Sequence, residues 1–147
     1  MMHGSLYGRG VSVLLLGVSL AACSARQEPA PVLDPGTALQ AIPPADPAKY
    51  EHMQDMKNWR NPYLVIRKDG VALLDVADNA EIVLKSDELL SALARLPASN
   101  WPYGRVVAAT ETGAGAAEDA VAIRRTKGIV GGILEGAHVA VRWVPAA

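Results

Sequence analysis

The sequence predicts an α+β fold, a two-layer sandwich in which two helices cover one face of a mostly antiparallel sheet. Three short apolar runs separated by turn residues lie within residues 63–84, a pattern typical of antiparallel strands. Segments 86–96 and 117–134 instead carry apolar residues at helical spacing, and the apolar runs 105–110 and 138–144 follow them. A group of strands followed by alternating helices and strands favours the α+β class.

A short helix is expected at the start of the domain, from Asp46 to Trp59. Asp46 suits the N-cap position, and Pro47 suits the first helical turn because its missing N–H would have no partner there. Asn61-Pro62 is expected to end this helix.

Three strands are expected next, over residues 63–66, 71–76 and 80–84. The first two form a hairpin around Lys68-Asp69-Gly70, because Asp-Gly supplies the positive φ of twisted hairpin turns. Asp78-Asn79 is expected to make the turn to the third strand.

Two helices and two further strands complete the expected fold. Ser86 opens the first helix with an acidic first turn, and Pro97 ends it. The second helix runs from Ala117 to about Leu134, with Gly136 where a C-cap belongs. The residues expected to face the core are Leu89, Leu90, Leu93 and Leu96 on the first helix, and Ala122, Ile129, Val130, Ile133 and Leu134 on the second.

Residues 1–22 have the pattern of a signal peptide. Arg9 and the amino terminus form a weakly basic start, and the apolar run Val11 to Leu20 is shorter than the roughly 20 residues a membrane span needs. The run ends in Leu20-Ala21-Ala22-Cys23, which resembles the lipobox of bacterial lipoprotein precursors. The alternative, ordinary cleavage after a small-x-small motif, would place Leu20 where a small residue belongs.

The resemblance implies that residues 1–22 are removed and that Cys23 becomes a lipid anchor. Cys23 is the only cysteine, so no disulfide can form within the chain. A diacylglyceryl group with palmitate-type chains, usually joined by an amide-linked acyl chain, gives stable attachment where one chain does not. Ser24 stands where an aspartate commonly retains lipoproteins in the inner membrane. This implies an outer-membrane protein whose domain faces the periplasm.

Residues 23–46 are expected to form a disordered, lipid-anchored linker, and residues 47–147 a single small α+β domain. Six of the ten prolines lie within residues 24–47, and proline-rich segments favour extended, polyproline-like conformations. The linker would tether the domain to the membrane.

Charge excludes one class of partner. Loss of Arg9 with the signal peptide leaves thirteen basic and fifteen acidic residues, a net charge of about −2. Nucleic acid is not an expected partner, because its binding needs clustered Lys and Arg. No cofactor or metal is expected either, since His52 and His138 do not stand at metal-ligand spacing. The expected partners are the membrane, through the lipid on Cys23, and a periplasmic or envelope protein.

Aromatic residues and one arginine are the candidate binding residues. Tryptophan, tyrosine and arginine are enriched at binding hot spots. One cluster of them lies just before the first strand, and another lies in the loop after the helix expected at residues 86–96. The alternative is that the rings seal a core that contains no phenylalanine. The candidate residues are Trp101, Tyr103, Arg105, Trp59 and Tyr63.

The glycine-rich turn Thr112–Asp119 has two interpretations. It could bind an anion at a helix start, but Glu118 and Asp119 would repel phosphate, so a flexible connector is the alternative. Gly128 and Gly132, four residues apart, are expected to let the second long helix pack closely on the sheet.

A wider resemblance covers residues 59–144, which are similar to small bacterial lipoproteins of uncharacterised function through Trp101–Val107. The domain also resembles the periplasmic domain of the ExbD/TolR family, through Val65-Ile66, Asp69-Gly70 and Tyr103–Val107. That family has a transmembrane helix where this chain has the lipobox, and it has a further strand before its tyrosine. No functional residue is transferred from it.

Three functions remain open. The leading hypothesis is a lipid-anchored cell-envelope protein with a non-catalytic periplasmic binding domain, because no catalytic motif is present. The first alternative is an immunity or inhibitor lipoprotein that acts against a periplasmic toxin or lysozyme-like enzyme. The second is a hydrolase whose site is assembled only in the fold, with a serine beside His52 or His138.

Overall fold

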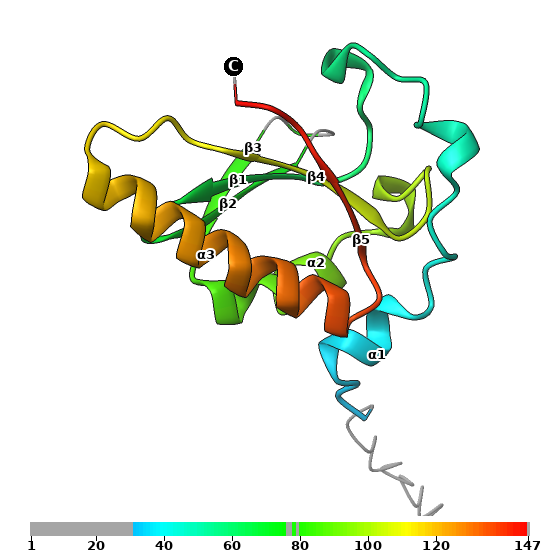
Figure 1. Cartoon of the computed structure of the whole chain (residues 1–147). Coiled ribbons are helices and arrows are strands. Elements are labelled where there is room, and N and C mark those ends of the chain that lie inside the picture. The colour runs from blue at the N-terminus through cyan, green and yellow to red at the C-terminus, as the bar shows by residue number, and fades with distance from the viewer. Residues whose placement is uncertain (1–30, 76–77, 79, 147) are drawn as a thin grey trace, which may run out of the picture. The chain divides into compact units, whose positions relative to one another are not determined.

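The computed structural model describes residues 31–75, 78 and 80–146 (Figure 1). The expected signal peptide, the lipidation site Cys23 and the first part of the expected linker lie outside the described residues. The chain divides into two compact units, 1–31 and 32–147, and the second unit is the domain described below. Among the residues described, no helix is both long and apolar enough to cross a membrane.

A five-stranded mixed sheet forms the domain, in the order β3-β2-β1-β4-β5. The strands are β1 (Tyr63–Arg67), β2 (Gly70–Asp75), β3 (Ala80–Leu84), β4 (Val106–Glu111) and β5 (Ala140–Trp143). The pairs β1–β2 and β2–β3 are antiparallel, whereas β1–β4 and β4–β5 are parallel.

This arrangement confirms the α+β class but corrects the expectation of a mostly antiparallel sheet. Helical connections precede and follow β4, and such crossovers return the chain in its starting direction. Only β2 therefore runs against the other four strands of the sheet.

The helices are α1 (Pro35–Leu39), α2 (Leu89–Ala94) and α3 (Ala117–Gly136). Figure 1 shows α2 and α3 on the same side of the sheet, which confirms the expected two-layer arrangement. Short 3₁₀ turns add to these elements at Pro47–Lys49, Met56–Asn58, Ser86–Glu88 and Ala98–Asn100.

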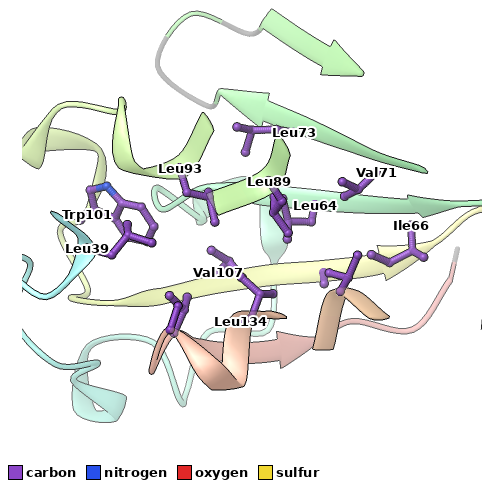
Figure 2. Packing of buried hydrophobic residues seen from close by; sticks show 14 of the residues in the cluster. Leu39, Leu64, Ile66, Val71, Leu73, Leu89, Leu93, Trp101, Val107 and Leu134 are labelled. Carbon is purple, nitrogen blue, oxygen red and sulfur yellow. The ribbon is translucent and has the colours of Figure 1, made fainter. Parts of the chain in front are cut away.

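The main core lies between the sheet and the helices (Figure 2). Alternation along the strands selects its residues, because successive side chains of a strand point to opposite faces. Leu64 and Ile66 of β1 point to the helices, while Tyr63 lies on the other face. The fully buried large apolar residues of this core are Leu39, Leu64, Ile66, Val71, Leu73, Leu89, Leu93, Val107, Val130 and Leu134.

The buried stripe of α3 differs from the expected one. Ile123, Thr126, Val130 and Leu134 are buried, whereas Ile129 is 49% exposed. A helix turns by about 100° per residue, so a stripe that contains Val130 and Leu134 turns its neighbour Ile129 toward solvent.

The folded domain starts earlier than expected. Leu39 of α1 is completely buried and lies beside Trp101 (Figure 2). Asp34 caps this helix by accepting a hydrogen bond from the Thr37 N–H at 3.2 Å. The boundary expected at residue 47 therefore moves to about residue 32, and the second half of the expected linker belongs to the fold.

The helix expected from Asp46 to Trp59 is absent, and this segment contains two 3₁₀ turns instead. The segment covers part of the sheet face opposite the helices, where Tyr50, Met53 and Met56 pack around Trp59. Backbone carbonyl oxygens that a helix would bond internally instead accept hydrogen bonds from a side chain of β5 here.

Gly70 also plays a different part from the expected one. The described glycine with positive φ is Gly104, not Gly70. A Cβ atom at position 70 would lie 2.4 Å from the Leu84 carbonyl oxygen, so the hairpin needs glycine there for the close approach of β3.

Candidate functional site

Two of the five candidate binding residues are buried on the helix side of the sheet. Trp101 is 4% exposed and belongs to the main core, where it lies against Leu39 (Figure 2). Arg105 is 8% exposed, and its guanidinium donates a hydrogen bond to the side-chain oxygen of Gln40. Both residues therefore connect the loop before β4 with the part of the domain around α1.

The other three candidates belong to a second core on the opposite face. The ring centroids of Trp59 and Tyr103 are 5.2 Å apart, and those of Tyr50 and Trp59 are 5.7 Å apart in an edge-to-face contact. Tyr63 packs against the same cluster. Edge-to-face and tilted pairs at these separations are the favourable geometry for aromatic rings.

Trp59, Trp101 and Arg105 are buried and Tyr63 and Tyr103 are partly buried, which agrees with the core-sealing interpretation. The sheet separates Trp101 from Trp59 and Tyr103, so the fold does not gather the aromatic rings into one exposed patch. The tryptophan, tyrosine and arginine of the loop that contains Trp101 therefore reflect packing of the domain.

Asn61 is a key residue that sequence analysis did not select. Its side chain is fully buried and donates to the carbonyl oxygens of Gly104 and Val106, at 2.8 Å and 2.7 Å. Its own side-chain oxygen accepts from the Tyr103 N–H at 3.0 Å. In the sequence, Asn61-Pro62 indicates a turn, and nothing in this local pattern indicates the long-range hydrogen bonds of Asn61.

An open groove beside the end of β5 is the most promising binding feature. Its cavity volume is about 480 Å³, and the segment after Tyr50 forms one wall while β5 and the residues after it form the other. The lining contains apolar, acidic and basic side chains: Glu51, His52, Met53, Gln54, Met56, Arg142, Trp143, Val144 and Pro145.

Arg142 holds the two walls of the groove together. Its guanidinium donates to the carbonyl oxygens of Tyr50 and Met53, the latter at 2.5 Å, and its charge lies 6.0 Å from the Tyr50 ring centroid. These bonds cross from β5 to the irregular segment, so the groove keeps its shape without support from a regular helix.

Trp143 lies at the junction of this groove and a second hollow of about 350 Å³. The Lys127 ammonium lies 4.5 Å from its ring centroid and also pairs with the Glu111 carboxylate. The tryptophan is nevertheless 41% exposed. A large ring held by a cation but open to solvent is available for contact with a partner.

The backbone of β5 is also open on one side, because β5 ends the strand order of the described sheet. The Ala140 and Val144 N–H groups donate to carbonyl oxygens of Arg105 and Ala109, on the β4 side. Backbone groups alternate in direction along a strand, so those of Val141 and Trp143 point away from β4.

His52 and the glycine-rich turn, the other features singled out in the sequence, lie in separate hollows. The nine residues that line the His52 groove include no serine, the partner that the hydrolase alternative requires. At the glycine-rich turn, the Asp119 carboxylate lies 3.2 Å from the Lys68 ammonium, which places a negative charge in the hollow where an anion would bind. Within the described part of the chain, no three His, Cys, Asp or Glu side chains converge on one point.

Gly128 and Gly132 were expected to pack against the sheet, but they do not. A Cβ atom at either position would meet no other atom within 4 Å, so this side of α3 is open.

Comparison with protein-family models, with curated proteins and with solved structures found no match to this chain.

Proposed function

We propose that the protein is a lipid-anchored component of the bacterial cell envelope, whose domain binds an extended segment of another envelope protein without catalysing a reaction. The observation that carries the proposal is the groove beside Trp143, which combines a lining of apolar and polar side chains with an open strand edge.

The side chains of the groove suit a peptide partner. Met53 and Met56 are flexible and polarisable, so they adapt to the apolar side chains of a bound segment. Trp143 lies at the rim of the groove with its ring beside α3, and it offers the kind of large, partly exposed ring that dominates many interfaces. Arg142 is already bonded to two backbone carbonyls, so it shapes the groove.

The open edge of β5 supplies the second part of recognition. An extended segment can hydrogen-bond to the outward backbone groups of Val141 and Trp143 and place alternate side chains in the groove. Main-chain bonds would provide affinity, and the fit of the side chains to the groove would provide selectivity.

The lipid on Cys23 places this groove near a membrane. Because the domain starts at about residue 32, the tether is shorter than the expected linker and spans at most about 25–30 Å when extended. The partner would therefore meet the domain close to the bilayer surface.

Site-specific photo-crosslinking in living bacterial cells tests the groove. A photoreactive residue at His52 should form a defined crosslink to one envelope protein, and the same residue at the exposed Arg124 of α3 should not. Trp143→Ala should reduce the His52 crosslink by about tenfold or more, as expected for a hot-spot residue. Ile129→Ala removes a similarly exposed apolar side chain on α3 and is the matched control. Equal crosslinks in the two variants would contradict the proposal.

A further inference from the structure

A second interaction surface lies along β3, at the sheet edge opposite β5. Ile82 and Val83 are exposed apolar residues in the middle of this strand, and Val83 is 62% exposed. All five residues of β3 pair with β2 in one continuous register. A regular, apolar strand at a sheet edge is a template on which another strand can pair.

The backbone groups available on this edge can be identified. The close approach of Gly70 shows that the Leu84 carbonyl points toward β2. Because direction alternates along an antiparallel strand, the N–H and C=O groups of Glu81 and Val83 point outward.

The side chains on the same residues are self-complementary in charge. Glu81 and Val83 are at alternate positions of β3 and therefore lie on one face of the sheet. Lys85 directly follows β3 with an extended backbone, so it continues this alternation. If an identical strand runs antiparallel with a two-fold axis at Val83, Glu81 of each copy lies opposite Lys85 of the other. The geometry points to a second copy of this chain as the occupant of the β3 edge.

The charge pattern also selects one register. Residues paired across antiparallel strands share a face, so the strands can slide only in steps that keep odd residues opposite odd residues. A shift in one direction brings Val83 opposite Glu81, and a shift in the other brings Val83 opposite Lys85. Only the register centred on Val83 forms both Glu81–Lys85 pairs.

Neighbouring contacts support this register. Glu81 already bonds the Arg67 guanidinium within its own sheet, so its carboxylate is held in place before a second copy arrives. Ile82 of one copy lies beside Leu84 of the other on the helix face, which covers an apolar side chain that is exposed in the single chain.

This inference is independent of the proposed function. Pairing at β3 leaves the groove beside β5 open, because the two strands lie at opposite ends of the sheet. A dimer without groove binding, or groove binding without a dimer, would separate the two proposals.

Cysteine crosslinking in the purified full chain tests the pairing. In a Cys23→Ser background, Val83→Cys provides the only thiol, and Ile129→Cys on α3 is the exposed control. The Cα atoms of two hydrogen-bonded antiparallel partners are about 5.5 Å apart, within the range that a disulfide spans. Mild oxidation should give a covalent dimer for Val83→Cys but not for Ile129→Cys. Equal yields from the two positions, or no dimer from Val83→Cys, would overturn the proposal.

Charge reversal tests the register with exposed substitutions, in chains that carry Val83→Cys. Lys85→Glu or Glu81→Lys alone places like charges opposite each other in both pairs, and each should weaken dimer formation about tenfold. A mixture of the two variants restores one opposite-charge pair at each end, so crosslinking between the two variants should recover. Loss of crosslinking in the mixture, with both variants folded by circular dichroism, would contradict the Val83-centred register.

Discussion

The side-chain amide of Asn61 donates a hydrogen bond to the carbonyl oxygen of Gly104 over 2.8 Å, and so joins segments 43 residues apart in the sequence. With its bonds to Val106 and Tyr103, this side chain fixes the irregular segment before β1 against the start of β4. The groove beside Trp143 depends on the position of that irregular segment, so Asn61 connects the core with the candidate site.

Asn61→Ala should destabilise the domain by about 2–4 kcal/mol, because it removes two buried hydrogen bonds and one partly buried one and leaves their backbone partners unsatisfied. The urea concentration at the unfolding midpoint is the measurement. Asn100→Ala is the control, since Asn100 makes one partly buried bond to Asp75, and it should cost about 1 kcal/mol or less. Equal losses in the two variants would show that Asn61 does not have the proposed structural role.

Glycine substitutions should have opposite effects at two positions. Gly104 has φ 78°, and a Cβ atom there would lie 2.1 Å from the Pro44 carbonyl oxygen, so Gly104→Ala should cost more than about 2 kcal/mol. Gly128 lies in the interior of α3 with open space around it, so Gly128→Ala should stabilise the domain by about 0.5–1 kcal/mol. Thermal unfolding of both variants checks the signs, and destabilisation by Gly128→Ala would mean that this side of α3 is covered.

Substitutions of Trp101 test whether this residue belongs to the core or to a binding surface. Trp101→Ala should destabilise the domain by about 3–5 kcal/mol, whereas Trp101→Phe should cost less than about 1.5 kcal/mol. The phenylalanine keeps most of the apolar volume and removes an indole N–H that is buried without a hydrogen-bond partner among the described atoms. Denaturant unfolding gives both values. A Trp101→Ala variant of normal stability that had lost its partner would instead favour a binding loop.

Trp143 should show the reverse behaviour. It is partly exposed at the sheet edge, so Trp143→Ala should cost about 1–2 kcal/mol or less, mainly through lost contact with the Lys127 ammonium. The same variant should lose the His52 crosslink described above. Unfolding curves measured beside the crosslinking yield separate the two effects, and a fully unfolded Trp143→Ala variant would show that the ring belongs to the core.

The strands could be predicted from the sequence because local patterns determine them. Apolar runs between Asn61-Pro62, Asp69-Gly70 and Asp78-Asn79 leave few alternatives, and each expected strand is present within a few residues of its expected bounds. Parallel pairing could not be predicted in the same way, since it depends on where a helical connection returns the chain and not on any one strand.

The candidate site was harder to predict because exposure depends on distant packing. The aromatic-arginine loop would be exposed if residues 31–46 were a free linker. Leu39 is buried in the same core as Trp101, and Gln40 accepts a hydrogen bond from Arg105, so one short helix in a proline-rich segment changes the role of the loop. Trp143, in contrast, falls in an apolar strand pattern that gives no sign of its exposure at the sheet edge.

The intact mass of the membrane-extracted protein, which reports lipidation of Cys23, tests the proposed function most directly, because the proposed location of the groove depends on this lipid. The intact mass of the wild-type protein extracted from bacterial membranes should equal that of residues 23–147 plus the acyl groups. Cys23→Ala should leave the lipid-modified form undetectable and release the protein from the membrane fraction. A Cys23→Ala variant that stayed in the membrane with the same precursor mass as the wild type would contradict the account.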